Sequence, residues 1–328
     1  MKYQDQWEQF EETGKVADYL AYCRQAGQMS AGNIMDGSAL GMAVAENVMW
    51  SGSVRNAGEG DWDRGDNGTP QEVAKHAGDD NGDGDDLTTS PLKEYDRRVE
   101  ILTRERGRIS AFAQGARRPN SALSACTILF TFGTFTLYPG RDSYRLQSGS
   151  IQTQFGELAQ DYDALCYCSY FGEMARYFTR EGVEASRELM LLYVTLRAVM
   201  HGKMTLPLVR VIYELRLMMI EGEMVELFQC LHCGTKEVNT VYLQAGGLLC
   251  PACAAKDKTT KDAYPIQLSS DALYTLQYIL TSEWSKLYAF GVSEEVLREL
   301  THFMKRYLGR YLPHQFKSEA FLKQILRK

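Results

Sequence analysis

The chain has 328 residues, of which 45% are hydrophobic and 24% are charged, and its formal net charge at pH 7 is −6. This composition is ordinary for a globular protein and excludes a collagen-like or fully disordered chain. No apolar run approaches the ~20 residues that cross a bilayer, and residues 1–15 lack the apolar core of a secretory signal. We therefore expect a cytoplasmic protein.

The acidic residues are concentrated near the start of the chain. Residues 1–90 hold 6 Lys and Arg against 17 Asp and Glu, whereas residues 91–328 hold 30 against 25. Residues 56–86 alone contain ten acidic residues, two basic residues and seven glycines. A stretch of this composition cannot bury enough apolar surface to offset the entropy lost on ordering. We therefore predict a disordered acidic insertion at 56–86, followed by a mildly basic globular part.

Residues 1–44 are predicted to form an N-terminal extension, made of a short helix and a linker. Apolar side chains such as Trp7, Phe10 and Leu20 recur through its first half, around a break at Gly14. From residue 28 onward the segment is rich in Gly, Ala and Met, which is typical of a linker. The extension by itself indicates no function.

Residues 95–152 have the period-two pattern of β-strands. Val99 and Ile101 alternate with polar neighbours, and the run 129–138 is rich in the aromatic and β-branched residues that suit strands. Pro139 and Gly140 then mark a turn. Several short strands with tight turns over such a short length predict a small barrel or sandwich.

After residue 160 the apolar pattern becomes helical. The segments with this pattern are 161–181, 184–201, 207–221, 269–281 and 293–312. Pro207 stands in the first turn of its segment, and Gly202 and Gly222 follow the ends of two segments, as expected of helix starts and stops. Ser293 is a suitable N-cap for the last segment. The second half of the chain is therefore predicted to be a helical domain.

Two CxxC pairs interrupt this helical region. Cys230 and Cys233 form the first pair, Cys250 and Cys253 form the second, and sixteen residues separate them. In a reducing cytosol such pairs are more often metal ligands than disulfides, and the spacing is that of zinc knuckles. Four cysteines would close the tetrahedral coordination sphere of zinc, so we predict one structural Zn²⁺ and no catalytic metal. His232 could replace one of the cysteines.

Three segments resemble, in matching order, the RecO family of DNA repair proteins. They are EYDRRVEILTRERGRISAFAQGARR and the residues that follow it (94–146), FQCLHCG…AGGLLCPAC (228–253) and LSSDALYTLQYIL…HQFKSEAFL (268–322). The resemblance implies an α+β multidomain protein, with an N-terminal OB-fold β-barrel followed by an α-helical domain that holds an inserted four-cysteine zinc knuckle. It also implies a recombination mediator that binds single- and double-stranded DNA and anneals complementary strands. With RecR as a partner, the mediator would help to load recombinase on strands coated by single-strand-binding protein (SSB).

The resemblance also suggests how the chain divides into domains. The expected parts are an extension at 1–44, an OB-fold domain at 45–155 interrupted by 56–86, and a helical domain at 156–328 with its zinc knuckle at 228–255. Family members begin almost directly with the first barrel strand, which residues 45–55 resemble. We expect the acidic stretch to be inserted after this strand, because loop length costs only logarithmically. The alternative is a barrel that lacks a strand.

An OB-fold binds a single strand through a basic groove and aromatic platforms. Residues 91–118 hold eight basic residues against four acidic ones, and Arg side chains pair with phosphates and stack on bases. The candidate DNA-binding residues are Arg97, Arg98, Arg104, Arg106, Arg108, Phe112, Arg117, Arg118, Tyr138 and Tyr144. Arg117 and Arg118 are the strongest pair, because phosphate can approach the loop before Pro119. The opposing interpretation is a solvated charged face with aromatic residues in the core.

The sequence contains no phosphate-binding loop, nucleophile elbow or metalloprotease motif, so we expect a protein that is not an enzyme. We expect it in the bacterial cytoplasm, associated with the nucleoid when active, with no membrane or small-molecule partner. Two other functions stay open. One is a zinc-stabilised scaffold for protein interactions, since residues 91–328 are only mildly basic. The other is an OB-fold RNA-binding factor.

Overall fold

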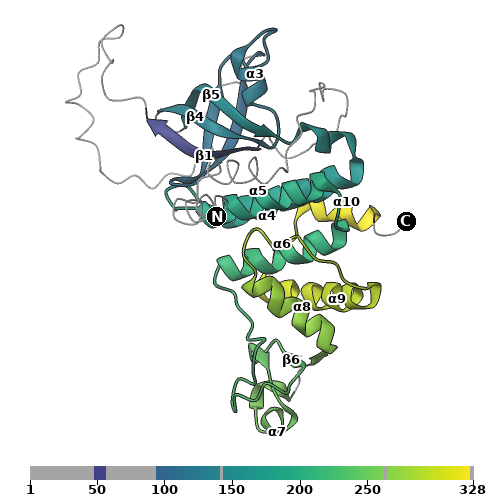
Figure 1. Cartoon of the computed structure of the whole chain (residues 1–328). Coiled ribbons are helices and arrows are strands. Elements are labelled where there is room, and N and C mark those ends of the chain that lie inside the picture. Colours follow the sequence, from purple (N-terminus) through teal and green to yellow (C-terminus); the bar gives the residue numbers. More distant parts are fainter. Residues whose placement is uncertain (1–47, 57–93, 141–142, 262–263, 326–328) are drawn as a thin grey trace, which may run out of the picture.

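The computed structural model describes residues 48–56, 94–140, 143–261 and 264–325. A β-barrel lies at one end, a helical body lies in the middle, and a small module with short strands lies at the other end (Figure 1). The predicted extension at 1–44, and the predicted acidic insertion apart from Asn56, lie outside the described residues. The chain is a mixed α+β protein whose sheet domain precedes its helical region, as the sequence predicts.

Five strands close the barrel in the order β1-β2-β3-β5-β4. They are β1 (Val48–Asn56), β2 (Arg97–Thr103), β3 (Gly107–Ala113), β4 (Thr131–Pro139) and β5 (Tyr144–Gln154), with the short helix α3 (Ala122–Cys126) between β3 and β4. Alternate residues of the strands fill the interior, among them Val99, Ile109 and Phe135. Gly149 has to be glycine, because a Cβ there would lie 2.7 Å from the Phe135 ring and 2.8 Å from Sγ of Cys126.

Strand β1 occupies most of the segment 45–55, which the sequence predicts as the first strand. It pairs in parallel with both neighbours: Val48 lies opposite Glu100 of β2, and Trp50 lies opposite Phe132 of β4. Among the described strands, β1 thus closes the barrel between β2 and β4.

The helical body shares its apolar core with the barrel. Its elements are the short 3₁₀ turn η1 (Gly156–Gln160) and the helices α4 (Tyr162–Phe178), α5 (Ser186–His201), α6 (Leu206–Ile220), α8 (Ser270–Thr281), α9 (Glu294–Tyr311) and α10 (Lys317–Ile325). Three aromatic rings meet edge to face at this contact. The ring centroid of Phe132 in β4 lies 5.5 Å from that of Phe155 and 4.9 Å from that of Tyr193 in α5, and the Phe155 and Tyr193 centroids are 5.7 Å apart. Such pairs add to the stabilisation that burial provides, so β4 and α5 are firmly attached.

The turn between β2 and β3 docks on the loop between α4 and α5. The backbone N–H of Gly182 donates to the carbonyl of Arg106 at 2.9 Å, and that of Ala185 donates to the carbonyl of Arg104 at 2.9 Å. Gly107 lies so close to this loop that a Cβ would be 2.0 Å from the carbonyl oxygen of Arg180. Glycine is required at this turn, and the hairpin is fixed against the helices.

The segment between α6 and α8 forms the distal module (Figure 1). It contains β6 (Thr240–Tyr242), β7 (Gly247–Leu248) and β8 (Ile266–Gln267), which pair in the order β7-β6-β8, together with α7 (Pro251–Ala254) and the 3₁₀ turn η2 (Lys258–Thr260). Among the described helices, none combines the length and apolar character that crossing a bilayer requires.

Candidate metal centre and nucleic-acid surface

The four cysteines of the two CxxC pairs come together in the distal module. The Sγ atoms of Cys230, Cys233, Cys250 and Cys253 all lie within 4.8 Å of one another, and those of Cys233 and Cys250 are 3.7 Å apart. Zinc–sulfur bonds of about 2.3 Å in a tetrahedron place sulfur atoms roughly 3.8 Å apart. The cluster is thus within metal-binding distance, and its donor set fits a soft divalent ion.

The surroundings of the cluster favour a thiolate. Burial alone would raise the pKa of Cys230, but hydrogen bonds from the backbone N–H groups of Cys233, Cys250 and His232 lower it to about 6. The N–H of Cys250 lies 3.4 Å from Sγ of Cys230. The thiolate is the form of cysteine that binds metal, so the backbone prepares at least one ligand in advance.

His232 does not belong to the cluster. Its Nε2 lies 2.7 Å from Oδ2 of Asp257, and the His232 side chain is half-exposed. Hydrogen bonds, first from Thr259 and then from His232, lower the pKa of Asp257 to about 2. The histidine therefore ties the first CxxC loop to the turn that begins at Asp257, and it leaves the four sulfurs as the ligand set.

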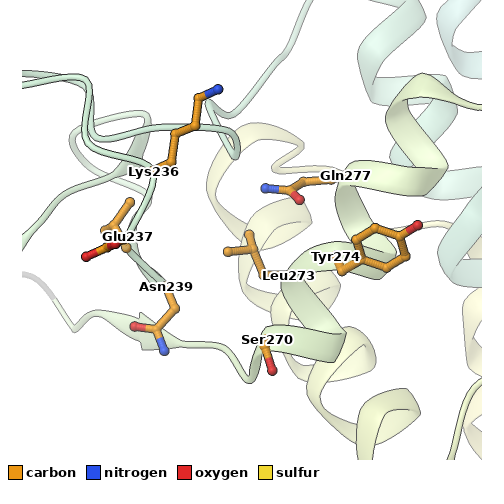
Figure 2. Close-up of a pocket in the computed structure, with 8 residues that line it drawn as sticks. Lys236, Glu237, Asn239, Ser270, Leu273, Tyr274 and Gln277 are labelled. Carbon is orange, nitrogen blue, oxygen red and sulfur yellow. The ribbon is translucent and has the colours of Figure 1, made fainter.

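A solvent-open cavity of about 490 Å³ lies where the module meets α8. Figure 2 shows Leu273 and Gln277 pointing from α8 toward the loop that carries Lys236 and Glu237. The amide of Gln277 donates to the carbonyl of Leu227 at 2.6 Å and thereby holds the module against the helix. We assign no ligand to this cavity, since the described contacts around it serve to attach the module.

The candidate DNA-binding arginines fall into two groups, and the first makes contacts within the protein. Arg97 is half-buried and donates to the carbonyl and hydroxyl oxygens of Thr127 at 3.0 and 3.1 Å. Burial, and then the charge of nearby Arg117, lower its pKa. Arg104 pairs with Glu105 at 3.1 Å, at the turn that docks on the helices. These two side chains are mainly engaged inside the molecule.

Arg106, Arg108 and Tyr144 also belong to this first group. Arg106 Nη1 donates to the hydroxyl of Tyr144 at 3.2 Å, and the Tyr144 ring packs against the barrel core. Arg108 lies between the barrel and the helices, where Nη1 is 3.4 Å from Glu100 Oε1 and Nε donates to the carbonyl of Thr179. Their contacts help to join the hairpin to the rest of the protein.

The second group lies at the end of the barrel remote from the helical contact. Arg98, Arg117 and Arg118 are exposed, whereas Phe112 and Tyr138 are half-buried. These three arginines are the exposed members of the candidate set, and the five residues come from β2, β3, β4 and the loop after β3. The structure thus concentrates half of the candidate residues on one accessible part of the barrel.

Two residues that sequence reasoning missed lie on the same part of the barrel. Tyr95 is 46% exposed, its carbonyl accepts from the N–H of Arg117 at 3.0 Å, and its ring lies 5.8 Å from the guanidinium of Arg118. Arg145 of β5 is exposed, and it lies opposite both Phe112 and Tyr138. Arg145 is isolated from the basic run in sequence, and only the register of the strands brings it to the other residues.

Comparison with known proteins covers both parts of the molecule. The family models Recombination protein O N terminal and Recombination protein O C terminal match residues 84–155 and 159–320. The DNA repair protein RecO of Acetivibrio thermocellus is 32% identical over 237 residues, which are 71% of this chain and 92% of that protein. RecO of Bacillus pumilus is 28% identical, over 73% of this chain and 91% of its own length. The chain belongs to the RecO family of DNA repair proteins.

Proposed function

We propose that the protein is a recombination mediator that binds single- and double-stranded DNA on the barrel and anneals complementary strands. It would help RecR to load recombinase on strands coated by SSB, without catalysing a reaction itself. Membership of the RecO family supports a role in DNA repair. The observation that carries the proposal of DNA binding on the barrel is the group formed by exposed Arg98, Arg117 and Arg118 and half-buried Phe112 and Tyr138.

The barrel would act as an OB-fold. Its five strands and closed order are compatible with that architecture. In this proposal, residues 45–155 form the DNA-binding domain, residues 156–328 form the helical domain, and residues 228–255 form its zinc knuckle. The protein would work in the cytoplasm and join the nucleoid when it binds DNA.

The loop that carries Arg117 and Arg118 would contact phosphates. Asn120 in this loop has a φ of 62°, and asparagine tolerates this left-handed conformation better than most residues. Both arginines are exposed. Because water solvates their charges, neither needs an acidic partner within the protein. Each arginine that pairs with a phosphate releases about one counterion, so binding should weaken steeply as salt is added.

The cysteine cluster would hold one structural Zn²⁺. Cys230, Cys233, Cys250 and Cys253 would supply all four ligands, which leaves no open coordination position for substrate or water. Bound zinc would link the two halves of a module whose own apolar cluster is small, with Cys230, Leu249 and Ala254 as its buried members. The metal would therefore stabilise the module and take no part in chemistry.

The test is the annealing of two complementary DNA strands that are pre-coated with the cognate SSB. The reaction contains no nucleotide, its progress is monitored by fluorescence, and it is repeated across a salt series. We expect rapid, salt-sensitive annealing, and we expect the double variant Arg117→Ala/Arg118→Ala to slow it and to reduce the salt dependence. The variant Arg298→Ala is the matched control, because Arg298 is an exposed arginine of the helical body. Absence of annealing by folded, zinc-loaded protein would favour a protein-interaction scaffold, and preference for RNA strands would favour an RNA-binding factor.

A further inference from the structure

The barrel surface carries a row in which arginine and aromatic residues alternate across four strands. Arg98 of β2 lies opposite Phe112 of β3, Phe112 lies opposite Arg145 of β5, and Arg145 lies opposite Tyr138 of β4. Paired strands are about 4.8 Å apart, so each member of the row is next to the following one. The row runs across the strands and uses residues that are far apart in the sequence.

The four side chains of the row face away from the barrel interior. Successive residues of a strand point to opposite sides of the sheet, and the chain neighbours of the row point inward. These buried neighbours are Val99, Ala111, Ala113, Leu137 and Leu146. The two arginines are exposed and the two aromatic rings are half-buried, so all four are accessible to a ligand on the outside.

The acidic residues nearest to the row in sequence are Asp96 and Glu100, each two positions from Arg98, and both are engaged in other contacts. Oδ1 of Asp96 accepts from the backbone N–H of Gly115 at 2.8 Å. Glu100 lies on the same face of β2 as Arg98, but its Oε1 is 2.7 Å from Arg176 of α4 and 3.4 Å from Arg108. Arg98 Nε donates to the hydroxyl of Ser110 at 3.0 Å, which orients its guanidinium along the surface. The positive charge of the row is thus available for an anionic ligand.

We propose that this row binds an unpaired nucleic-acid strand, with bases stacked on Phe112 and Tyr138 and phosphates paired with Arg98 and Arg145. The inference rests on the proposed DNA-binding function and adds strand selectivity to it. The two aromatic positions are two strand spacings apart, about 10 Å. A side-chain ring can stack on a base only where that base is released from its neighbours, as in a single strand. Duplex DNA would contact the arginines but not the rings.

The experiment compares two fluorescently labelled strands of equal length by fluorescence polarisation at one salt concentration. One is oligothymidine, and the other carries abasic sites in place of its central bases, so that both have the same phosphates. The variants are Phe112→Leu and Tyr138→Leu, which keep an apolar side chain and are checked for folding by circular dichroism. Tyr274→Leu is the control, because Tyr274 is a 67% exposed aromatic residue on α8.

We expect the wild type to bind oligothymidine about fivefold or more tightly than the abasic strand for each stacked base. Phe112→Leu and Tyr138→Leu should each reduce this ratio, with little effect on the affinity for duplex DNA, and Tyr274→Leu should preserve it. Equal affinity of the wild type for both strands would overturn the stacking row and leave the proposed DNA-binding function intact. Failure to bind any DNA would overturn both.

Discussion

Gly107→Ala should destabilise the protein by detaching the β2–β3 turn from the helices. The Cβ of alanine would lie 2.0 Å from the carbonyl oxygen of Arg180 and 2.4 Å from that of Val183, so the turn has to move by about 1 Å. Movement weakens three backbone hydrogen bonds, which link residues 104, 106 and 108 to the α4–α5 loop. Each weakened hydrogen bond should cost about 1 kcal/mol, and the left-handed backbone conformation should cost alanine about 1 kcal/mol more. We therefore expect the free energy of unfolding to fall by about 4 kcal/mol.

Gly202→Ala is the matched control for this prediction. Gly202 also has a φ of 62°, but a Cβ there meets no atom within 4 Å, so its cost should be only the backbone term of about 1 kcal/mol. The free energy of unfolding of both variants can be measured by urea denaturation followed by circular dichroism. Equal losses for the two variants would refute the reasoning, because the steric contact with the α4–α5 loop would then contribute nothing.

Three further changes test other parts of the structure. Cys253→Ser should abolish stoichiometric zinc binding and expose the module to protease while the helical circular-dichroism signal of the body persists; wild-type protein without bound zinc would contradict this. Burial, together with Glu188, raises the pKa of Glu221 to about 7, so wild-type stability from this group is lost as pH rises from about 4.5 through 7. Glu221→Gln should therefore raise the melting temperature more at pH 8 than at pH 5, and an equal shift at both values would count against it. Glu173→Gln should cost about 1 kcal/mol at pH 7, because the carboxylate accepts from the N–H groups of Lys317 and Ser318; unchanged thermal unfolding would contradict the capping role.

Helix boundaries were predictable where the signal is local. Gly202 ends α5 in the left-handed conformation, Pro207 stands in the first turn of α6, and the hydroxyl of Ser293 accepts from the N–H of Val296 at the start of α9. The start of α10 carries no such signal, because its cap is Glu173 from α4. A carboxylate supplied from a distant helix leaves no trace in the local sequence, and this explains why the sequence did not predict α10 as a separate helix.

The candidate sites were also predictable to different degrees, because one depends on local sequence and the other on contacts between distant segments. The ligand set of the metal cluster depends on two short loops, so the spacing of the cysteines is enough to identify it. The placement of the basic run depends on which side of each strand is covered by helices. Arg98 and Arg108 lie in adjacent strands and both point outward, yet only Arg108 meets the helical body. Sequence alone could not separate them, and it could not connect Arg145 to the others.

The division of the arginines follows from the cost of burying charge. A guanidinium that leaves water needs a hydrogen-bonding or acidic partner, and Arg108 obtains one in Glu100 at the contact with α4. Arg98 and Arg145 remain in solvent, where no partner is needed for folding. Glu100 is therefore neutralised where the barrel meets α4, while the guanidinium groups of Arg98 and Arg145 stay exposed on the barrel surface. In this way a chain with a net charge of −6 can still present a local surface suited to phosphates.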